Sequence, residues 1–415
     1  MNTQACVIDI GTGYTKLGFS GNSEPQFIMP TTVGMKYDPE QVLRGPSSNV
    51  DPDLDVVIGD KCFTTSAANY TVKYPVQQGC VDNWSSMETF LHSSIYEYMN
   101  IRPGDHFFLM TEPPLNPPEN REYLGEIMFE TFNIPGLYIA VQAVLALAAS
   151  WPYRKSEERS LTGMVLDSGD GLTHAVPVAE GFVIGSCIKQ IPVAGRNVTR
   201  YIQTLLRERD EPVPPEMSSE VAKEIKEKYC YVCPDITKEF DKYSASPEKW
   251  LKVYNGINNI TQKPFSIDIG FERFMAPEVY FRPGIENSQF DTSLANVIDD
   301  AIQACPIDVK RDLYSNIVLS GGSTMFKDFG RRLQRDIKRI TDNRHSYFTR
   351  QATEGFVPKP TEVVVCSHKM QRYAVWFGGS IYATTESFYR ESIKREDYLE
   401  RGASICRQSP IFNAF

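Results

Sequence analysis

The order of apolar and polar residues along the chain predicts two similar strand–turn–strand units. The first begins with the apolar run at residues 5–10, which ends at Gly11-Thr12-Gly13, and residues 14–19 then alternate and include β-branched and aromatic side chains. A short apolar run bounded by glycine is typical of a buried strand, and alternation is typical of a half-buried one. Residues 163–178 repeat this succession around a second glycine pair.

The two units match at the Asp, both Gly and the Thr. Their sequences are Asp9-Ile10-Gly11-Thr12-Gly13-Tyr14-Thr15-Lys16 and Asp167-Ser168-Gly169-Asp170-Gly171-Leu172-Thr173-His174. We interpret the match as an internal repeat, in which two related lobes each supply a glycine hairpin from a sheet of their own. Chance similarity of two glycine turns is the alternative.

Two further segments carry strong patterns. Residues 317–320 form another apolar strand that ends at a glycine pair, and the pattern at residues 327–340 predicts a helix after it. Residues 137–151 are rich in Ala and Leu and predict a buried helix.

Composition narrows the class of protein. A length of 415 residues predicts two or three domains, and a net charge of −9 disfavours nucleic acid or an anionic membrane as the main partner. The nine cysteines are irregularly spaced, as in a reducing compartment, and Cys230 and Cys233 predict packed thiols because no second pair lies at zinc spacing. No signal peptide or membrane-length apolar run is visible. We expect a cytoplasmic protein without a nucleic-acid partner or membrane insertion.

Glycine turns suit phosphate binding because the backbone can approach closely and its N–H groups can point into one concavity. Two such turns could hold a polyphosphate from both sides, and Lys16 could supply a cation. Neither a Walker loop nor a Rossmann fingerprint is present. Asp9 and Asp167, at equivalent strand ends, would repel phosphate unless a divalent cation intervened, and Mg²⁺ suits this role. The pattern therefore predicts an Mg²⁺–nucleotide site; the alternative is that each Asp caps its own turn.

Longer motifs resemble those of the actin family nearly from end to end. Besides the two hairpins and Leu319–Phe326, which resemble the phosphate loops and the adenosine loop, the matching segments are Leu109-Met110-Thr111-Glu112, Leu115-Asn116-Pro117, Ile127-Met128-Phe129-Glu130-Thr131-Phe132-Asn133, Gln142-Ala143-Val144-Leu145, Ile225-Lys226-Glu227-Lys228 and Val375-Trp376-Phe377-Gly378-Gly379-Ser380. The insert at residues 152–160 and the tail Arg407–Phe415 resemble the actin-related branch of this family rather than actin itself.

The resemblance implies an α/β fold: the duplicated actin-like ATPase fold, with two lobes that each hold a mixed β-sheet flanked by helices, and with the nucleotide in the interlobe cleft. It also implies four domains. The large domain of lobe one comprises residues 1–35, 75–153 and 374–415, and its small domain comprises 36–74; the large domain of lobe two comprises 154–193 and 285–373, and its small domain comprises 194–284.

The resemblance also assigns residues to ATP and Mg²⁺. Nucleotide contacts fall on Thr12, Gly13, Tyr14, Lys16, Asp170, Gly171, Leu172, Gly195, Lys223, Lys226, Glu227, Gly322, Ser323, Met325, Phe326 and Arg372, the last of which is Lys in actin. Asp9 and Asp167 would hold Mg²⁺ through water, and Gln142, Asp167 and His174 would surround the attacking water. For Gln142 the alternative is a satisfied amide on an apolar helix.

The function implied is that of an ATP-binding subunit in a seven-protein complex that starts actin branches, gated by lobe closure, with slow ATP hydrolysis as a timer rather than a metabolic activity. Its partners would be a sister actin-related subunit, the other subunits, actin, and a helix of a nucleation-promoting factor, all in the cytoskeleton. Conventional polymerising actin and a small-molecule kinase on the same superfold are the alternatives.

Two regions of the sequence predict where partner proteins could or could not bind. Residues 36–62 share little with the DNase-binding loop of actin, and Gln78 replaces an expected His, so that filament-type contacts at this end are in doubt. An amphipathic helix could dock in a groove between the lobe bases. Its lining would be Ala148, Ala149, Ile381, Tyr382 and Tyr398, for which plain core is the alternative.

Overall fold

A computed structural model describes residues 4–36, 56–63, 70–153, 160–258, 261–286, 290–351 and 359–407. The chain forms two compact units. Unit 1 comprises residues 1–149 and 373–415, and unit 2 comprises residues 150–372. The finer division into four domains stays a prediction.

The main sheet of unit 1 has six strands in the order β19-β10-β9-β1-β2-β3. β1 pairs with β2 in antiparallel and with β9 in parallel orientation, and β9 pairs with β10 in parallel. The bounds are β1 Cys6–Ile10, β2 Tyr14–Phe19, β3 Phe27–Pro30, β9 Phe108–Glu112, β10 Gly136–Val141 and β19 Ile393–Lys394.

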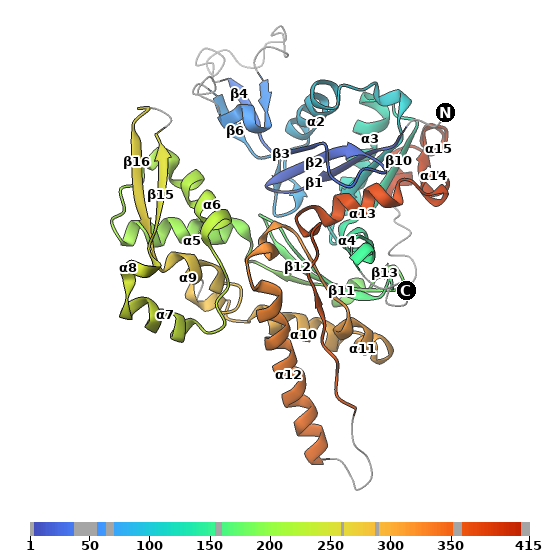
Figure 1. Cartoon of the computed structure of the whole chain (residues 1–415). Coiled ribbons are helices and arrows are strands. Elements are labelled where there is room, and N and C mark those ends of the chain that lie inside the picture. The colour runs from blue at the N-terminus through green and yellow to red at the C-terminus, as the bar shows by residue number, and fades with distance from the viewer. Residues whose placement is uncertain are drawn as a thin grey trace. The chain divides into compact units, whose positions relative to one another are not determined.

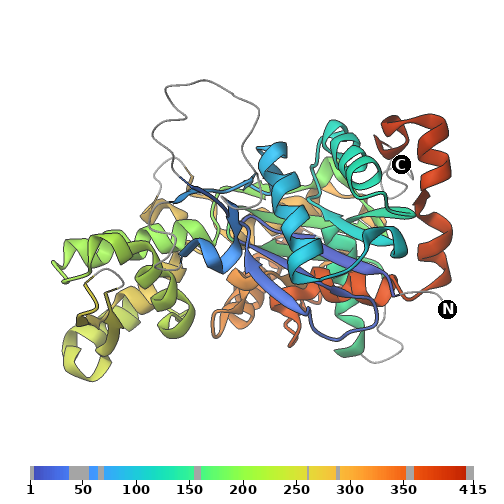
Figure 2. The ribbon, with the colours of Figure 1, turned by 90° about the horizontal axis from the view of Figure 1, so that it is seen from above.

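Helices cover both faces of this sheet because the strands are apolar on both (Figure 1). On one face Ile8 and Leu17 belong to a core cluster with Phe90 of α2 (Trp84–Ser93), which crosses the first two strands when viewed from above (Figure 2). On the other face Trp376 of α13 (Ala374–Tyr382) donates its ring N–H to the carbonyl of Val7 at 3.0 Å. The alternation along β1 thus places successive residues in different layers.

The remaining elements of unit 1 are small sheets and helices. β4 (Val33–Lys36) pairs with β5 (Val56–Ile58) and β6 (Tyr70–Lys73), and β7 (Val76–Gln77) pairs with β8 (Cys80–Val81). The helices are α3 (Pro118–Glu126), α4 (Gln142–Ala149), α14 (Glu386–Glu391) and α15 (Arg395–Arg401).

The sheet of unit 2 repeats the topology of unit 1. Its order is β13-β12-β11-β17-β18, and β14 also pairs with β12. β11 pairs with β12 in antiparallel orientation, as β1 does with β2. The pairings of β11 with β17 and of β17 with β18 are parallel, as are those of β1 with β9 and of β9 with β10. The bounds are β11 Gly163–Ser168, β12 Thr173–Ala179, β13 Phe182–Val183, β14 Lys189–Ile191, β17 Ile317–Ser320 and β18 Val365–Cys366.

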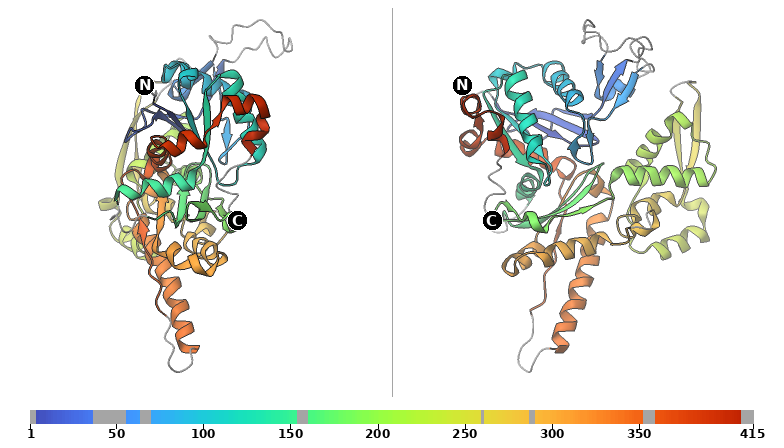
Figure 3. Two further views of the ribbon diagram at one scale, coloured as in Figure 1. Left: turned by 90° about the vertical axis from the view of Figure 1, so that its right-hand side faces the viewer. Right: turned by 180° about the vertical axis from the view of Figure 1, so that it is seen from behind.

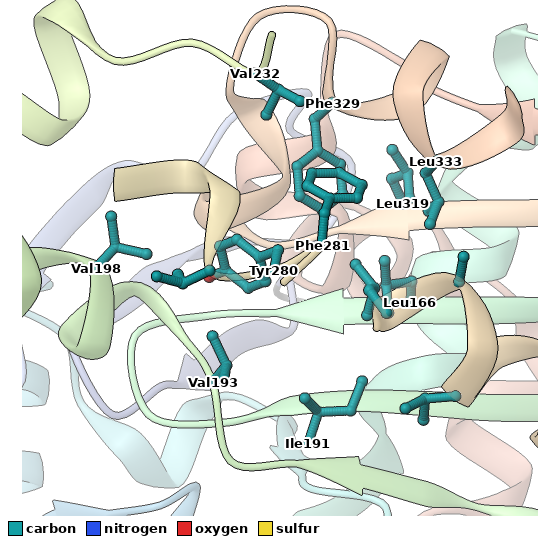
Figure 4. Close-up of a cluster of buried hydrophobic side chains, with 14 of the residues drawn as sticks. Leu166, Ile191, Val193, Val198, Val232, Tyr280, Phe281, Leu319, Phe329 and Leu333 are labelled. Carbon is teal, nitrogen blue, oxygen red and sulfur yellow. The ribbon is translucent and has the colours of Figure 1, made fainter. Parts of the chain in front are cut away.

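The core of unit 2 joins this sheet to its helices. Leu166 and Leu319 of the sheet belong to one cluster with Phe329 and Leu333 of α12 (Phe329–Gln351), and Figure 4 shows these side chains gathered beside Tyr280. In both views of Figure 3 the C-terminal half of α12 extends beyond the other helices of this unit. The other elements are α5 (Gly195–Glu208), α6 (Ser218–Tyr229), α7 (Ile236–Ala245), α8 (Pro247–Trp250), α9 (Glu272–Glu278), α10 (Leu294–Ala304), α11 (Ile307–Ser315), and the hairpin of β15 (Lys252–Ile257) and β16 (Pro264–Ile269).

The strand–turn–strand predictions are confirmed at both glycine hairpins. The helix expected at residues 327–340 is confirmed from Phe329 onward, as part of the longer α12. The buried helix expected over residues 137–151 is wrong in its first part. Residues 136–141 form strand β10 because they include the aromatic Tyr138 and the β-branched Ile139 and have a strand partner on either side, β9 and β19. The helix begins only at Gln142. Residues 37–55, within the irregular segment expected at 36–62, lie outside the described residues, as do residues 154–159 and 408–415.

A substitution tests how closely α13 packs on α4. A Cβ added at Gly378 would lie 2.0 Å from the backbone carbonyl oxygen of Leu145, which cannot move without moving α4. We expect Gly378→Ala to lower the stability of the protein by about 1–3 kcal/mol, measured by chemical denaturation, because overpacking outweighs the gain in helix propensity. Gly104→Ala, whose nearest contact would be an ordinary 3.5 Å, is the matched control. Equal stability of the two variants would contradict the packing described.

Candidate functional site

The first glycine hairpin fixes an acid opposite a base. In the antiparallel pair of β1 and β2, Asp9 lies directly across from Lys16, and the turn is closed by a hydrogen bond from the Gly11 N–H to the Tyr14 carbonyl at 3.2 Å. A Cβ on Gly11 would lie 2.7 Å from that carbonyl oxygen, so the turn requires glycine there. The glycine at this position of the sequence repeat is therefore required by the backbone geometry of the turn.

The carboxylate of Asp9 is buried and held on both oxygens. Lys16 Nζ lies 2.9 Å from Oδ2, and the Thr111 hydroxyl donates to Oδ1 at 2.7 Å. Gln142 Nε2 lies 3.5 Å from Oδ1 and 3.5 Å from the Thr111 oxygen. The structure thus brings three predicted residues of unit 1 (Asp9, Lys16 and Gln142) into one cluster, and it adds Thr111.

The other predicted residues of this turn contact neighbouring loops. The carbonyl of Gly13 accepts from the Thr31 N–H at 3.1 Å, and the Thr12 hydroxyl accepts from the Gly79 N–H at 2.9 Å. Gly79 and Gln78 both have a left-handed φ, of 81° and 49°, which makes the tight turn between β7 and β8. Gln78, which replaces the His expected from actins, therefore lies in a turn that is hydrogen-bonded to the first hairpin. Tyr14, the first residue of β2, is half-buried.

The second hairpin has the same register. Asp167 lies across from His174, and the Gly169 N–H donates to the Leu172 carbonyl at 3.4 Å. On its other side Asp167 neighbours Ser320 of β17. Both sheets therefore present an Asp at the same strand position, across from a basic residue in one unit and an imidazole in the other.

Several elements of unit 2 meet at the carbonyl of Gly169. It accepts from the Gly195 N–H at 3.0 Å and from the Ser323 hydroxyl at 2.6 Å, and the Gly195 carbonyl in turn accepts from Lys226 Nζ at 3.1 Å. A Cβ on Gly195 would lie 2.7 Å from Ser323 Oγ. The structure therefore gathers three predicted residues at the second hairpin: Gly195 of α5, Lys226 of α6 and Ser323 of the 3-10 helix Gly322–Met325.

Lys226 is a buried cation. Only 8% of its surface is exposed, and burial lowers its pKa, an effect that the charges of Asp170 and Glu227 oppose and that of Lys223 reinforces. A buried ammonium costs free energy unless it is paired, so its position beside a backbone carbonyl suits a site that also takes a polar or anionic ligand.

Two contacts of this site escaped the sequence analysis. Arg196 binds Asp170 twice, through its backbone N–H to the Asp170 carbonyl at 3.0 Å and through Nε to Oδ2 at 3.4 Å. Thr111 binds Asp9. Arg196 directly follows the predicted Gly195, and Thr111 lies in a quoted motif, but neither residue type signals a role before the strands are placed.

The remaining predicted residues follow Gly321, whose φ is 89° and whose N–H donates to the Gln371 carbonyl at 2.9 Å. Arg372 follows Gln371 in the chain and therefore lies near this turn. Met325 is half exposed, at 51%, and the ring centroid of Phe326 lies 6.5 Å from that of Tyr280. Gly322, with no atom within 4 Å of an added Cβ, faces open space. Gly171 and Leu172 are partly buried in the second turn, where the Leu172 carbonyl accepts from the Gly169 N–H.

These side chains fit a magnesium nucleotide better than a metal held by protein alone. Among the described residues, no group of three or more His, Cys, Asp or Glu side chains could hold a metal ion. Asp9 already binds Lys16 and Thr111, which suits an ion that keeps its waters and binds through phosphate oxygens. Within each unit, the glycine turn and its lysine, Lys16 in unit 1 and Lys226 in unit 2, suit phosphate binding.

The five residues predicted to line a partner groove all belong to unit 1 but differ in exposure. Ile381 is 38% exposed, whereas Ala149 and Tyr398 are buried. Tyr398 stacks on Phe129 at 4.5 Å between ring centroids and donates its hydroxyl to Glu130 at 2.7 Å. The Tyr382 hydroxyl donates to Glu391, and Ala148 is partly exposed. Ala149 and Tyr398 are thus core residues in this unit, and the groove stays a prediction that rests on the other three.

The thiols are free, as expected. Cys230 packs with the core cluster that includes Tyr229, and Cys233 packs with Tyr231. Burial raises the pKa of Cys230 to about 12 and that of Cys233 to about 11, which leaves both thiols protonated and unreactive at neutral pH. No helix in the described part of the chain is long and apolar enough to cross a membrane.

His174 predicts a pH effect on stability. Burial lowers its pKa from 6.5 to about 4, so between these values the unfolded chain binds a proton that the folded chain does not. Stability is therefore lost as pH falls from about 6.5 to about 4, by about 3 kcal/mol in total. We expect His174→Gln to remove this part of the pH dependence in chemical denaturation. His92→Gln, at an exposed position of α2, is the control and should keep the pH dependence of the unchanged chain. If both variants lost the same part of the pH dependence, His174 would not be a buried neutral imidazole.

The comparisons with known proteins agree with this geometry. Residues 1–409 match the family model described as Actin. The chain is 58% identical over 417 residues to "Actin-related protein 3" of Caenorhabditis elegans, covering 99% of this chain and 98% of that protein. It is also 58% identical over 412 residues to "Actin-related protein 3" of Drosophila melanogaster, covering 98% of each. With its duplicated sheets and hairpins, the chain belongs to the actin family.

Proposed function

We propose that the chain is an ATP-binding, actin-related subunit of the actin-related protein 2/3 complex, which starts branches on actin filaments. The observation that carries this proposal is the 58% identity, over nearly the full length, to relatives named actin-related protein 3. The family supports a nucleotide site, and the twin hairpins give that site a physical basis. We further propose that the chain acts in the cytoplasm, as part of the cytoskeleton.

In this proposal the glycine turn of each unit binds nucleotide phosphate. Unit 1 contributes the turn at residues 11–14 with Lys16, and unit 2 contributes the turn at residues 169–172 with Lys226. Successive N–H groups of a glycine turn suit phosphate oxygens, and the two ammonium groups add charge. The other predicted contacts to ribose and adenine come from α5, α6 and the segment from Gly322 to Phe326. Bound ATP with Mg²⁺ would supply the phosphate anhydride that is hydrolysed.

The chain's own residues would orient a water molecule for slow hydrolysis. Gln142 and His174 offer an amide and a neutral imidazole, and the low pKa of His174 keeps the imidazole uncharged, so that it can accept a hydrogen bond from a water molecule at neutral pH. Asp9 and Asp167 would bind waters of the metal.

Because only contacts that differ between the triphosphate and the diphosphate can shift a conformational balance, we propose that the γ-phosphate favours closure of the lobes.

We propose that closure aligns this subunit with its sister actin-related subunit, so that the pair mimics a filament end from which actin elongates. A helix of a nucleation-promoting factor would dock near Ala148, Ile381 and Tyr382. The partly exposed Ile381 and the neighbouring aromatic ring of Tyr382 suit the apolar face of an amphipathic helix.

Purification of the tagged full-length chain from its own cells tests the function. We expect a second actin-related subunit and further subunits to co-purify at equal stoichiometry, and the chain alone not to sediment as filaments with ATP and Mg²⁺. A chain that is recovered alone and forms filaments that pellet would support conventional actin instead. Phosphate release that a sugar stimulates would support a small-molecule kinase.

Substitution of Lys16 tests the nucleotide site. We expect Lys16→Ala to weaken ATP binding about 10- to 100-fold, measured with a fluorescent ATP analogue, because a charge-assisted hydrogen bond contributes about 1.5–3 kcal/mol. Lys228→Ala is the control, since Lys228 is exposed and pairs with Glu224 on the surface of α6. If Lys16 served only as the partner of Asp9, its loss would lower the melting temperature and leave the affinity for ATP unchanged.

A further inference from the structure

Thr111 lies between two other polar residues of unit 1, Asp9 and Gln142. It lies on β9, which pairs with β1 on one side and with β10 on the other. On one side, Thr111 lies beside Ala140 of β10, two residues before Gln142. On the other side, Met110 pairs with Ile8 of β1, so the next residues along these two strands are Thr111 and Asp9. Sheet order therefore puts Thr111 between the strand that carries Asp9 and the strand that leads to Gln142.

The hydrogen bonds of Thr111 have a defined direction. A carboxylate can only accept, so the Thr111 hydroxyl uses its single proton for Asp9 Oδ1, at 2.7 Å. Its oxygen is then left as an acceptor and faces Gln142 Nε2 at 3.5 Å. The order of donors runs from the Gln142 amide to the Thr111 hydroxyl and on to the Asp9 carboxylate, whose other oxygen binds Lys16.

This direction fixes which side of the Gln142 amide faces the cluster. The N–H side meets Thr111 and Asp9, so the amide oxygen is the group that can accept a hydrogen bond from a water molecule. Thr111 is only 6% exposed, and a buried hydroxyl costs free energy unless it is bonded. Its hydroxyl is thus committed to Asp9 and Gln142 rather than to solvent.

We propose that Thr111 is a positioning residue, which orients the Asp9 carboxylate and the Gln142 amide for hydrolysis of the bound nucleotide. This inference rests on the nucleotide site proposed above and deepens it. Thr111 acts through its two neighbours, so its loss should affect the chemical step more than the binding of ATP. A displacement of about 1 Å at a reacting group can cost a hundredfold in rate.

The test compares Thr111→Val, which keeps the shape of the side chain but removes the hydroxyl, with Thr111→Ser, which keeps the hydroxyl. For the purified full-length chain, two quantities are measured: the dissociation constant of a fluorescent ATP analogue over a range of Mg²⁺ concentrations, and the single-turnover rate of hydrolysis of bound ATP. Thr89→Val, at a threonine of α2 whose hydroxyl donates to the Ser85 carbonyl, is the matched control.

We expect Thr111→Val to slow hydrolysis about tenfold or more and to change the dissociation constant and its Mg²⁺ dependence by less than about threefold. Gln142→Ala should show the same separation, and Thr111→Ser should restore the rate to within about threefold of the unchanged chain. If Thr111→Val does not fold, Thr111→Ala is measured in its place against the same expectation.

Two results would overturn the inference. One is an unchanged rate in Thr111→Val; the other is an equal loss of rate and affinity that Ser does not rescue, which would make Thr111 a structural residue. Failure of the proposed function would look different, since the unchanged chain would then bind no ATP, or would bind it equally well after Lys16→Ala.

Discussion

The tight glycine turn between two strands is the constraint on which the rest of each unit depends. The turn at Gly11 leaves no room for a Cβ, because the Tyr14 carbonyl oxygen would lie 2.7 Å away. It fixes the register of β1 and β2, and that register sets Asp9 across from Lys16. A shift by one residue would move every side chain to the opposite face of the sheet, and the cluster around Asp9 would be lost.

The two units use the same hairpin for different surroundings. In unit 1 the acid is held by Lys16 and by Thr111 of the neighbouring parallel strand. In unit 2 the equivalent acid faces a buried imidazole, and the turn is bound from outside by α5 and Ser323. Duplication thus supplies the backbone geometry twice, and the neighbouring elements differentiate the two copies.

The sequence predicted the hairpins and their duplication, because glycine at a strand end leaves a local signal. It also pointed to Asp9, Lys16 and Asp167 as candidates, whereas most of the other candidate residues came from the resemblance to actins. It could not predict contacts that depend on strand order. Thr111 is one β-branched residue in an apolar strand, and its contacts with Asp9 and Gln142 appear only when β9 is placed between β1 and β10. The helix expected from Leu137 failed for a similar reason, since the strand partners of Leu137-Tyr138-Ile139 lie far away in the sequence. Likewise, the burial of Ala149 and Tyr398 follows from packing that a groove assigned by resemblance does not reveal.

The central proposal is that both glycine hairpins bind nucleotide phosphate, and amide hydrogen exchange of the full chain tests it most directly. Exchange is compared with and without ATP and Mg²⁺ in the peptides that contain Gly11–Tyr14 and Gly169–Leu172, since bound phosphate would occupy their N–H groups. The account predicts slower exchange in both peptides at the same ATP concentration. Slower exchange in only one of them, or in neither, would contradict it.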